Sequence, residues 1–246
     1  MALKGLIFDL GNTLMYFDGS WPEALKVADQ AMVSTLVKAG FQLDPERFDQ
    51  DFRVRLNAYY VERENELIEL TTAHILRSLL ADYGYPSVPD AVVNNALESL
   101  YHETQVYWTP EDDAQSTLIA LKDQGFLLGV ISNAGDDADV QHQVDKIGVR
   151  SCLDFVITSA ACGIRKPDPQ IFQIALDHWD LLPREVAMVG DTLNADVLGG
   201  QDSGLYTIWI TRRADTAANR AHQDTIRPDA VIQTLAELPG LLAGLQ

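Results

Sequence analysis

FDLGNTL, residues 8–14, includes the end of the first apolar run of the chain, LKGLIFDL at residues 3–10. The run has the composition of a buried strand, yet it carries a carboxylate, Asp9, just before the turn-forming pair Gly11-Asn12. The carboxyl ends of parallel strands lie at the edge where open α/β sheets bind ligands. Whether Asp9 is functional therefore depends on which residues the other strands bring to that edge.

Short apolar runs alternate with amphipathic helical patterns from about Trp108 onward, which predicts a parallel sheet with crossover helices. The expected strands are LKGLIFDL (3–10), FLLGVIS (126–132), DFVITSA (154–160), EVAMVG (185–190), LYTIWI (205–210) and DAVIQ (229–233). The expected helices of this part occupy residues 112–125, 137–148, 168–180, 194–204 and 234–245. The predicted fold class is α/β, with a doubly wound parallel-sheet (Rossmann-like) core.

Residues 16–107 interrupt this alternation with helical periodicity almost throughout and no convincing strand. We expect several helices with Gly or Pro breaks, in the segments 21–40, 44–84 and 88–108. Because the insertion starts at the carboxyl edge of the sheet, it is placed to act as a lid. The predicted organisation is a core domain of residues 1–15 and 108–246 and an all-helical cap domain of residues 16–107.

Composition excludes several classes of function. The 246 residues are 47% hydrophobic and carry a net charge of −18, without the basic stripe that nucleic-acid binding requires. No apolar stretch approaches the ~18 residues of a membrane span, and the first run is interrupted by Lys4 and Asp9 and lacks a cleavage site, so we expect a cytoplasmic protein without membrane contact. Cys152 and Cys162 are too few for a disulfide framework and are expected to be free thiols. The sequence leaves the oligomeric state open.

Polar residues cluster at or just after the ends of apolar runs in four separate segments. They are Asp9 in FDLGNTL, Ser132 and Asn133 in GVISNAG, Lys166 in GIRKPDPQIF, and Asp191 with Asp196 in MVGDTLNAD. Singly, each segment has an ordinary structural explanation as a turn, a helix cap or a solvated loop. Together they predict a site, because the carboxyl ends of parallel strands lie along one edge of a sheet.

The order and spacing of these segments resemble the haloacid dehalogenase (HAD) superfamily. Its phosphatases carry an Asp-x-Asp-x-Thr motif, a strand-terminal Ser or Thr, a Lys-Pro pair, and Gly-Asp followed by a second acid. The resemblance covers residues 1–15 and 108–246, and the insertion lies where the helical C1 cap of the family belongs. It implies a Mg²⁺-dependent phosphomonoester hydrolase that acts on a small phosphorylated metabolite.

The resemblance also implies which residues act on phosphorus. Asp9 would be the nucleophile and form an aspartyl-phosphate, which water then cleaves. Mg²⁺ would be held by Asp9, the backbone carbonyl of Gly11 and Asp191, while Asp196 would bind the metal directly or orient its waters. The metal would offset the repulsion between a carboxylate and an anionic phosphate.

Three further residues would bind the phosphoryl group. Lys166 would add a second positive charge, and Ser132 with the Asn133 amide would hold phosphoryl oxygens in the transition state. The local site would then be cationic on an anionic protein. The aromatic residues Tyr59, Tyr60, Tyr107 and Trp108 are expected to pack rather than to contact substrate, and Cys162 is expected to be a structural thiol.

The sequence departs from the family pattern at position 11. Most family phosphatases have a second Asp there, which protonates the leaving oxygen and later deprotonates the attacking water. Gly11 keeps the backbone carbonyl but lacks that carboxylate, and general acid-base catalysis typically contributes ~10²–10⁴-fold. Asn12 stands where the family usually has Gly, and Asn tolerates the left-handed backbone conformation better than most residues.

Three interpretations follow from the missing carboxylate. The favoured one is a phosphatase whose substrate has a good leaving group, or whose acid is Asp18, a cap residue or the substrate itself. The second is a 2-haloacid dehalogenase, although that branch typically has an aromatic residue at position 11 and a Ser-Asn-type fourth motif, whereas Gly190-Asp191 fits a magnesium site. The third is a catalytically weak module that binds a phosphorylated ligand, against which the retention of Asp9 argues.

A relative of phosphonoacetaldehyde hydrolase would need a Schiff-base lysine in the cap. Lys26 and Lys38 are the lysines available there, and neither lies in a recognisable motif. A phosphatase therefore remains the favoured interpretation.

Overall fold

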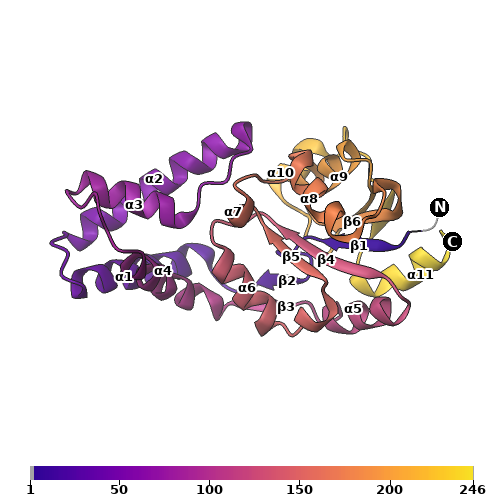
Figure 1. The fold of residues 1–246 in the computed structure, drawn as a ribbon, viewed down its shortest axis with the longest axis horizontal. Coiled ribbons are helices and arrows are strands. Elements are labelled where there is room, and N and C mark those ends of the chain that lie inside the picture. The colour runs from indigo at the N-terminus through magenta and orange to yellow at the C-terminus, as the bar shows by residue number, and fades with distance from the viewer. Residues whose placement is uncertain (1–2, 246) are drawn as a thin grey trace.

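The computed structural model describes residues 3–245 and places an α/β part beside a helical part along the long axis of the molecule (Figure 1). Within these residues, six parallel strands form one sheet in the order β5-β4-β1-β6-β7-β8. The strands are β1 (Gly5–Phe8), β4 (Leu127–Ser132), β5 (Phe155–Thr158), β6 (Val186–Gly190), β7 (Tyr206–Ile210) and β8 (Ala230–Ile232). The predicted α/β parallel-sheet class is confirmed.

Strand β1 lies inside the sheet, between β4 and β6, and all of its residues are buried. Its side chains alternate between two hydrophobic clusters, as the period of two in a strand requires. Leu6 and Phe8 join one cluster, whereas Ile7 joins the other. Helices therefore cover both faces of the sheet, and the end of β1 opens only at the sheet edge.

The helices of the α/β part follow most of the predicted segments. They are α5 (Ala114–Asp123), α6 (Asp137–Lys146), α7 (Ser159–Cys162), α8 (Pro169–Trp179), α9 (Gly199–Asp202), α10 (Ala217–His222) and α11 (Leu238–Ala243), with short 3₁₀ turns at Arg150–Cys152, Pro183–Glu185 and Leu235–Glu237. The predicted strand 154–160 ends at Thr158, whose hydroxyl accepts a hydrogen bond from the Ala161 N–H and begins α7. The segment 194–204 forms a π-helical turn, η3 (Leu193–Leu198), followed by α9, and α10 was not predicted.

The helical part has a hydrophobic cluster of its own. It consists of α1 (Trp21–Lys38), α2 (Pro45–Glu66), α3 (Thr72–Asp82) and α4 (Asp90–Gln105). The side chains of Met32, Phe48, Phe52 and Leu76 are completely buried in this cluster. Local signals set two of the helix starts, because the Asp44 and Thr71 side chains accept backbone N–H hydrogen bonds at the first turns of α2 and α3.

A two-stranded antiparallel ribbon joins the two parts of the molecule. Strand β2 (Met15–Phe17) pairs with β3 (Trp108–Pro110), and Tyr16 lies directly opposite Thr109. The prediction that residues 16–107 contain no strand is therefore wrong at Tyr16 and Phe17. The Arg213 guanidinium lies 3.4 Å from the centre of the Tyr16 ring and packs this ribbon against the α/β part.

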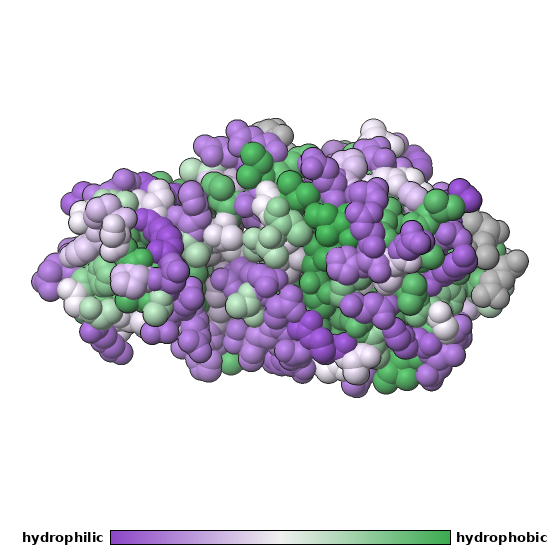
Figure 2. Space-filling view, viewed as in Figure 1, coloured by the Kyte–Doolittle hydropathy of each residue, from purple (hydrophilic) through white to green (hydrophobic). Residues whose placement is uncertain are grey.

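The surface and the cysteines agree with the composition. Figure 2 shows hydrophilic residues over both parts of the visible face, with hydrophobic residues gathered near the middle of the molecule. In residues 3–245, none of the helices combines the length and the apolar character needed to cross a bilayer. Cys152 and Cys162 are free thiols, as predicted.

Candidate active site

The predicted site residues converge at the carboxyl edge of the sheet. Asp9 follows β1, and the neighbouring strands β4 and β6 deliver Ser132 and Asp191 on either side of it. A cavity of about 480 Å³ opens at this edge. All seven residues predicted from the sequence line it: Asp9, Gly11, Ser132, Asn133, Lys166, Asp191 and Asp196.

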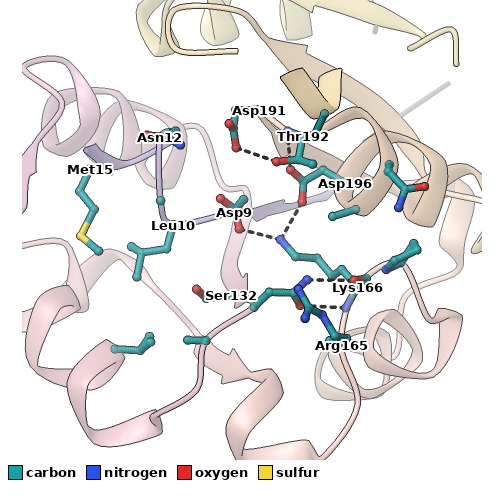
Figure 3. A pocket seen from close by; sticks show the side chains of 18 of the residues that line it. Asp9, Leu10, Asn12, Met15, Ser132, Arg165, Lys166, Asp191, Thr192 and Asp196 are labelled. Atoms are coloured by element: carbon teal, nitrogen blue, oxygen red, sulfur yellow. Dashed lines mark hydrogen bonds and ion pairs between the residues drawn. The ribbon is translucent and has the colours of Figure 1, made fainter. Parts of the chain in front are cut away.

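Lys166 links two of the carboxylates. Its Nζ lies 2.7 Å from Asp9 Oδ1 and 2.7 Å from Asp196 Oδ1, and its side chain is only 1% exposed (Figure 3). Burial alone would lower the pKa of this amine, but the two carboxylates raise it, so Lys166 stays charged. The Asn133 side chain holds the Lys166 backbone, because it donates to the Lys166 carbonyl at 2.9 Å and accepts from the Lys166 N–H at 2.8 Å.

The three acids form a compact cluster. One oxygen of each of Asp9, Asp191 and Asp196 lies within 4.8 Å of the others. Burial, followed by repulsion from Asp9 and Asp196, raises the pKa of Asp191 to about 8. Burial also raises the pKa of Asp9 to about 6, against the opposing effect of Lys166. Crowded carboxylates with raised pKa values favour a cation between them, and an all-oxygen set fits Mg²⁺ or Ca²⁺.

Gly190 allows the Asp196 side chain to approach the end of β6 closely. A Cβ at Gly190 would lie 2.2 Å from Asp196 Oδ2, so no side chain fits at the end of β6. The same Asp196 oxygen accepts a hydrogen bond of 2.9 Å from the Thr192 N–H. Gly190, the glycine of the Gly-Asp pair, thus makes room for the Asp196 side chain.

Asn219 supports the site from α10, and no sequence pattern pointed to it. Its side-chain amide donates to the carbonyl of Asp191 at 2.8 Å and accepts from the Leu193 N–H at 2.8 Å. Trp209 Nε1 donates to the same Asp191 carbonyl at 2.8 Å. These contacts fix the backbone of the loop that carries Asp191, and Asn219 was missed because α10 is short and polar.

Gly11 faces an aromatic ring. A Cβ at Gly11 would lie 3.8 Å from Trp108 Cη2, which is an ordinary van der Waals distance, so a side chain fits there. Asn12 has a φ of 57°, the left-handed conformation that Asn tolerates better than most residues. Trp108 lines the cavity, whereas packing alone was expected of it.

The cavity wall also contains residues that the sequence did not single out. They are, among others, Met15, Arg63, Leu67, Asp139, Arg165 and His222. Asp18, one of the alternative acids, is exposed and is not part of this wall. The described residues of the wall include Asp139 as the one carboxyl group outside the acidic cluster.

Comparison with known proteins identifies the family. The model of the haloacid dehalogenase-like hydrolases matches residues 3–204. The chain belongs to this family of hydrolases. The glyceraldehyde 3-phosphate phosphatase of Pyrococcus furiosus is 28% identical over an alignment of 255 positions, which covers 99% of this chain and 93% of that protein. The ribulose-1,5-bisphosphate 5-phosphatase of Halopiger xanaduensis is also 28% identical, over 97% of this chain and 98% of its own length.

A solved HAD structure has the same fold. The 2-haloacid dehalogenase of Pseudomonas syringae pv. Tomato superposes with a TM-score of 0.70 over 99% of this chain and 100% of that chain. The two sequences are 24% identical, so this likeness concerns the fold alone. The choice between a phosphatase, which attacks phosphorus, and a dehalogenase, which attacks carbon, therefore depends on the residues of the site.

Proposed function

We propose that this HAD hydrolase is a Mg²⁺-dependent phosphomonoester hydrolase that acts on a small phosphorylated metabolite through an aspartyl-phosphate intermediate. The observation that carries the proposal is the Lys166 amine bound between Asp9 and Asp196, beside the cluster completed by Asp191. This arrangement offers a nucleophile, a cation and a metal site within one cavity. The phosphatase names of the two relatives support phosphorylated substrates.

Asp9 is proposed as the nucleophile because it is the accessible member of the cluster. Its side chain is 14% exposed, against 2% for Asp196. A carboxylate oxygen of Asp9 attacks phosphorus while the bond to the leaving oxygen breaks, and water then attacks phosphorus to release phosphate and restore the carboxylate. Asp9, the Gly11 carbonyl, Asp191 and Asp196 would hold Mg²⁺. When bound, this ion supplies the positive charge that lets two anions meet.

The phosphoryl oxygens are held by the other side of the proposed site. Ser132 lines the cavity at the end of β4, and Lys166 supplies positive charge. The side-chain amide of Asn133 is engaged with the Lys166 backbone, so we assign the phosphate contact of Asn133 to its backbone N–H. These donors would stabilise charge on the transferring group.

Asp139 is our candidate for the acid that Gly11 does not supply. It lies on the same cavity wall as Trp108, whose ring faces Gly11. Gln105, at the end of α4, donates a hydrogen bond of 2.8 Å to Asp139 Oδ1. Burial raises the pKa of Asp139 to about 6, which brings it closer to the range of an acid that donates a proton near neutral pH.

We also propose that residues 16–107 form a cap domain on a core of residues 1–15 and 108–246. The separate hydrophobic cluster of the helices and the β2–β3 ribbon support this division. The linkers at Tyr16 and Thr109 pair with each other, so the two covalent connections between the proposed cap and core lie side by side. A cytoplasmic location and the lack of nucleic-acid binding remain predictions from composition.

A panel of three assays separates the phosphatase from its alternatives. We expect Mg²⁺-dependent release of phosphate from an aryl phosphate and no halide release from 2-chloropropionate. Halide release without phosphate release would support the dehalogenase. Binding of inorganic phosphate without turnover of either substrate would support the binding module.

A further inference from the structure

Two arginines lie on the cavity wall outside the acidic cluster and its bound lysine. Arg63 comes from the last turn of α2, and Arg165 immediately precedes Lys166. Arg165 lies on the same side of the cavity as Lys166 (Figure 3). Their side chains are only 23% and 9% exposed. Arg63 lies outside the four site segments, and Arg165 lies in the GIRKPDPQIF segment, where only Lys166 was given a role.

A buried carboxylate positions both guanidinium groups. The Glu69 side chain is 0% exposed, with Oε1 at 3.6 Å from Arg63 Nη1 and Oε2 at 3.8 Å from Arg165 Nε. Its two oxygens also accept hydrogen bonds from the Tyr59 hydroxyl at 2.7 Å and from the Ser159 hydroxyl at 2.9 Å. Burying a carboxylate is costly unless it is paired, so this arrangement has a defined geometry.

Backbone contacts hold the two arginines at one place although they come from different parts of the molecule. The Arg165 N–H donates to the Leu67 carbonyl at 3.1 Å, and the Glu69 N–H donates to the Gly163 carbonyl at 3.0 Å. The Arg63 guanidinium also stacks over the Tyr60 ring at 4.0 Å. These contacts position Arg63 and Arg165 before any ligand binds, and preorganisation of this kind lowers the entropy cost of binding.

The charge of the protein makes this pair of arginines unusual. The chain has a net charge of −18, and exposed charges act over a Debye length of roughly 8 Å at physiological salt, so an anionic ligand must find its positive charge locally. Lys166 already serves Asp9 and Asp196. Arginine presents a planar fork of donors that matches carboxylate and phosphate oxygens.

We propose that Arg63 and Arg165 bind a second anionic group of the substrate, a carboxylate or a second phosphate, at the end of the substrate remote from the phosphoryl group. The inference rests on the proposed function and narrows its substrate class to phosphorylated metabolites with two anionic ends. Arg63 is then a specificity residue contributed by the helical part. Arg165 is its counterpart in the α/β part.

The test compares ligands that differ in one anionic group. Binding is measured by calorimetry with Mg²⁺ in the Asp9→Asn variant, so that turnover is not needed. The pairs are 2-phosphoglycolate against 2-hydroxyethyl phosphate, 3-phosphoglycerate against glycerol 3-phosphate, and propane-1,3-diol bisphosphate against 3-hydroxypropyl phosphate. The first two pairs report on a remote carboxylate and the third on a remote phosphate.

We expect at least one ligand with two anionic groups to bind ~10–100-fold more tightly than its partner with the phosphate alone, as for charge-assisted hydrogen bonds. Adding Arg63→Met or Arg165→Met should reduce that ratio to about 1, and Arg63→Lys should restore part of it. In protein that keeps Asp9, either substitution should lower the kcat/KM preference for the substrate with two anionic groups, through a rise in the KM of that substrate. Arg55→Met is the matched control, because Arg55 also lies on α2 but bonds to Ser78 and Asp82 away from the cavity.

Equal binding of both members of every pair, or a preference that survives both substitutions, overturns the inference. Arg63→Met is the decisive variant if the more buried Arg165→Met proves unstable. Failure of the proposed function has a different signature, since it appears as absent Mg²⁺-dependent hydrolysis of aryl phosphate in the wild type. Hydrolysis of aryl phosphate without any preference for a second charge would leave the phosphatase and remove the arginine subsite.

Discussion

The sheet edge and the helical part line the same cavity in different ways. The edge supplies Asp9, Ser132 and Asp191 from adjacent strands, and their places are set by backbone hydrogen bonds such as the 2.9 Å bond from the Asp9 N–H to the Val189 carbonyl. The helical part supplies Arg63 and Leu67, whose places depend on side-chain packing and loop contacts. The proposed catalytic residues thus lie where strand register sets their positions. The proposed specificity residue Arg63 lies where side-chain packing and loop contacts set its position.

Replacing the proposed nucleophile should cause the largest loss of activity. A small loss would contradict the assignment of catalysis to the sheet edge. Asp9→Asn keeps the shape of the side chain but removes the attacking charge, so kcat/KM for an aryl phosphate should fall by about 10⁴-fold or more. Asp18→Asn, on an exposed residue, is the control and should retain activity. Full activity of Asp9→Asn, or of the wild type in excess EDTA, would rule out the mechanism.

Removing the lysine should be the next largest effect. Lys166→Met should lower kcat/KM by about 10³-fold, because it removes positive charge from the transition state. It should also lower the melting temperature without Mg²⁺, since Lys166 is buried between Asp9 and Asp196 and its loss leaves both charges uncompensated. The more exposed ion pair of Lys122 provides the control, and Lys122→Met should change neither quantity much. A loss below tenfold would remove Lys166 from the mechanism.

The acid is expected to contribute a smaller factor that depends on the leaving group. Asp139→Asn should slow alkyl phosphates by ~10–100-fold and aryl phosphates much less, because a good leaving oxygen needs little protonation. Gly11→Asp should restore alkyl hydrolysis in that variant, since a Cβ there meets only the Trp108 ring at 3.8 Å. Equal losses for both substrate classes would show that Asp139 is not the acid.

The acidic cluster should give the smallest effect, a shift of stability with pH. In the unfolded chain an Asp titrates near pH ~4. The folded pKa values of Asp9 and Asp191 are raised to about 6 and about 8, so the folded state binds more protons between these limits. Without metal, these groups should therefore reduce stability as the pH rises from ~4 to about 8.

Melting temperatures in excess EDTA and in saturating Mg²⁺ check this expectation. Mg²⁺ competes with protons for the same oxygens, so its stabilising effect should be larger at pH 8 than at pH 6. Asp191→Asn removes one of the raised groups and should flatten the dependence. A Mg²⁺ effect that does not vary with pH would argue against metal binding at this cluster.

Short elements and distant contacts account for what the sequence left unpredicted. Strand β2 has only three residues, which is too few for an alternating pattern to be visible. Helix α10 has six residues and little apolar periodicity, so the role of Asn219 could not be anticipated. Arg63 lies on a largely polar helix, where a charged residue is by default a solvated one.

The sequence by itself determined the α/β class, a largely helical insertion and seven residues that line one cavity at the sheet edge. It could do so because strand ends in a parallel sheet must share one edge, so the order of the motifs already implies their convergence. Only the tertiary structure decided that Glu69 joins Arg63 to Arg165 and that Trp108 faces Gly11. Those contacts join segments far apart in the chain through side-chain packing and loop pairing, and no local pattern encodes them.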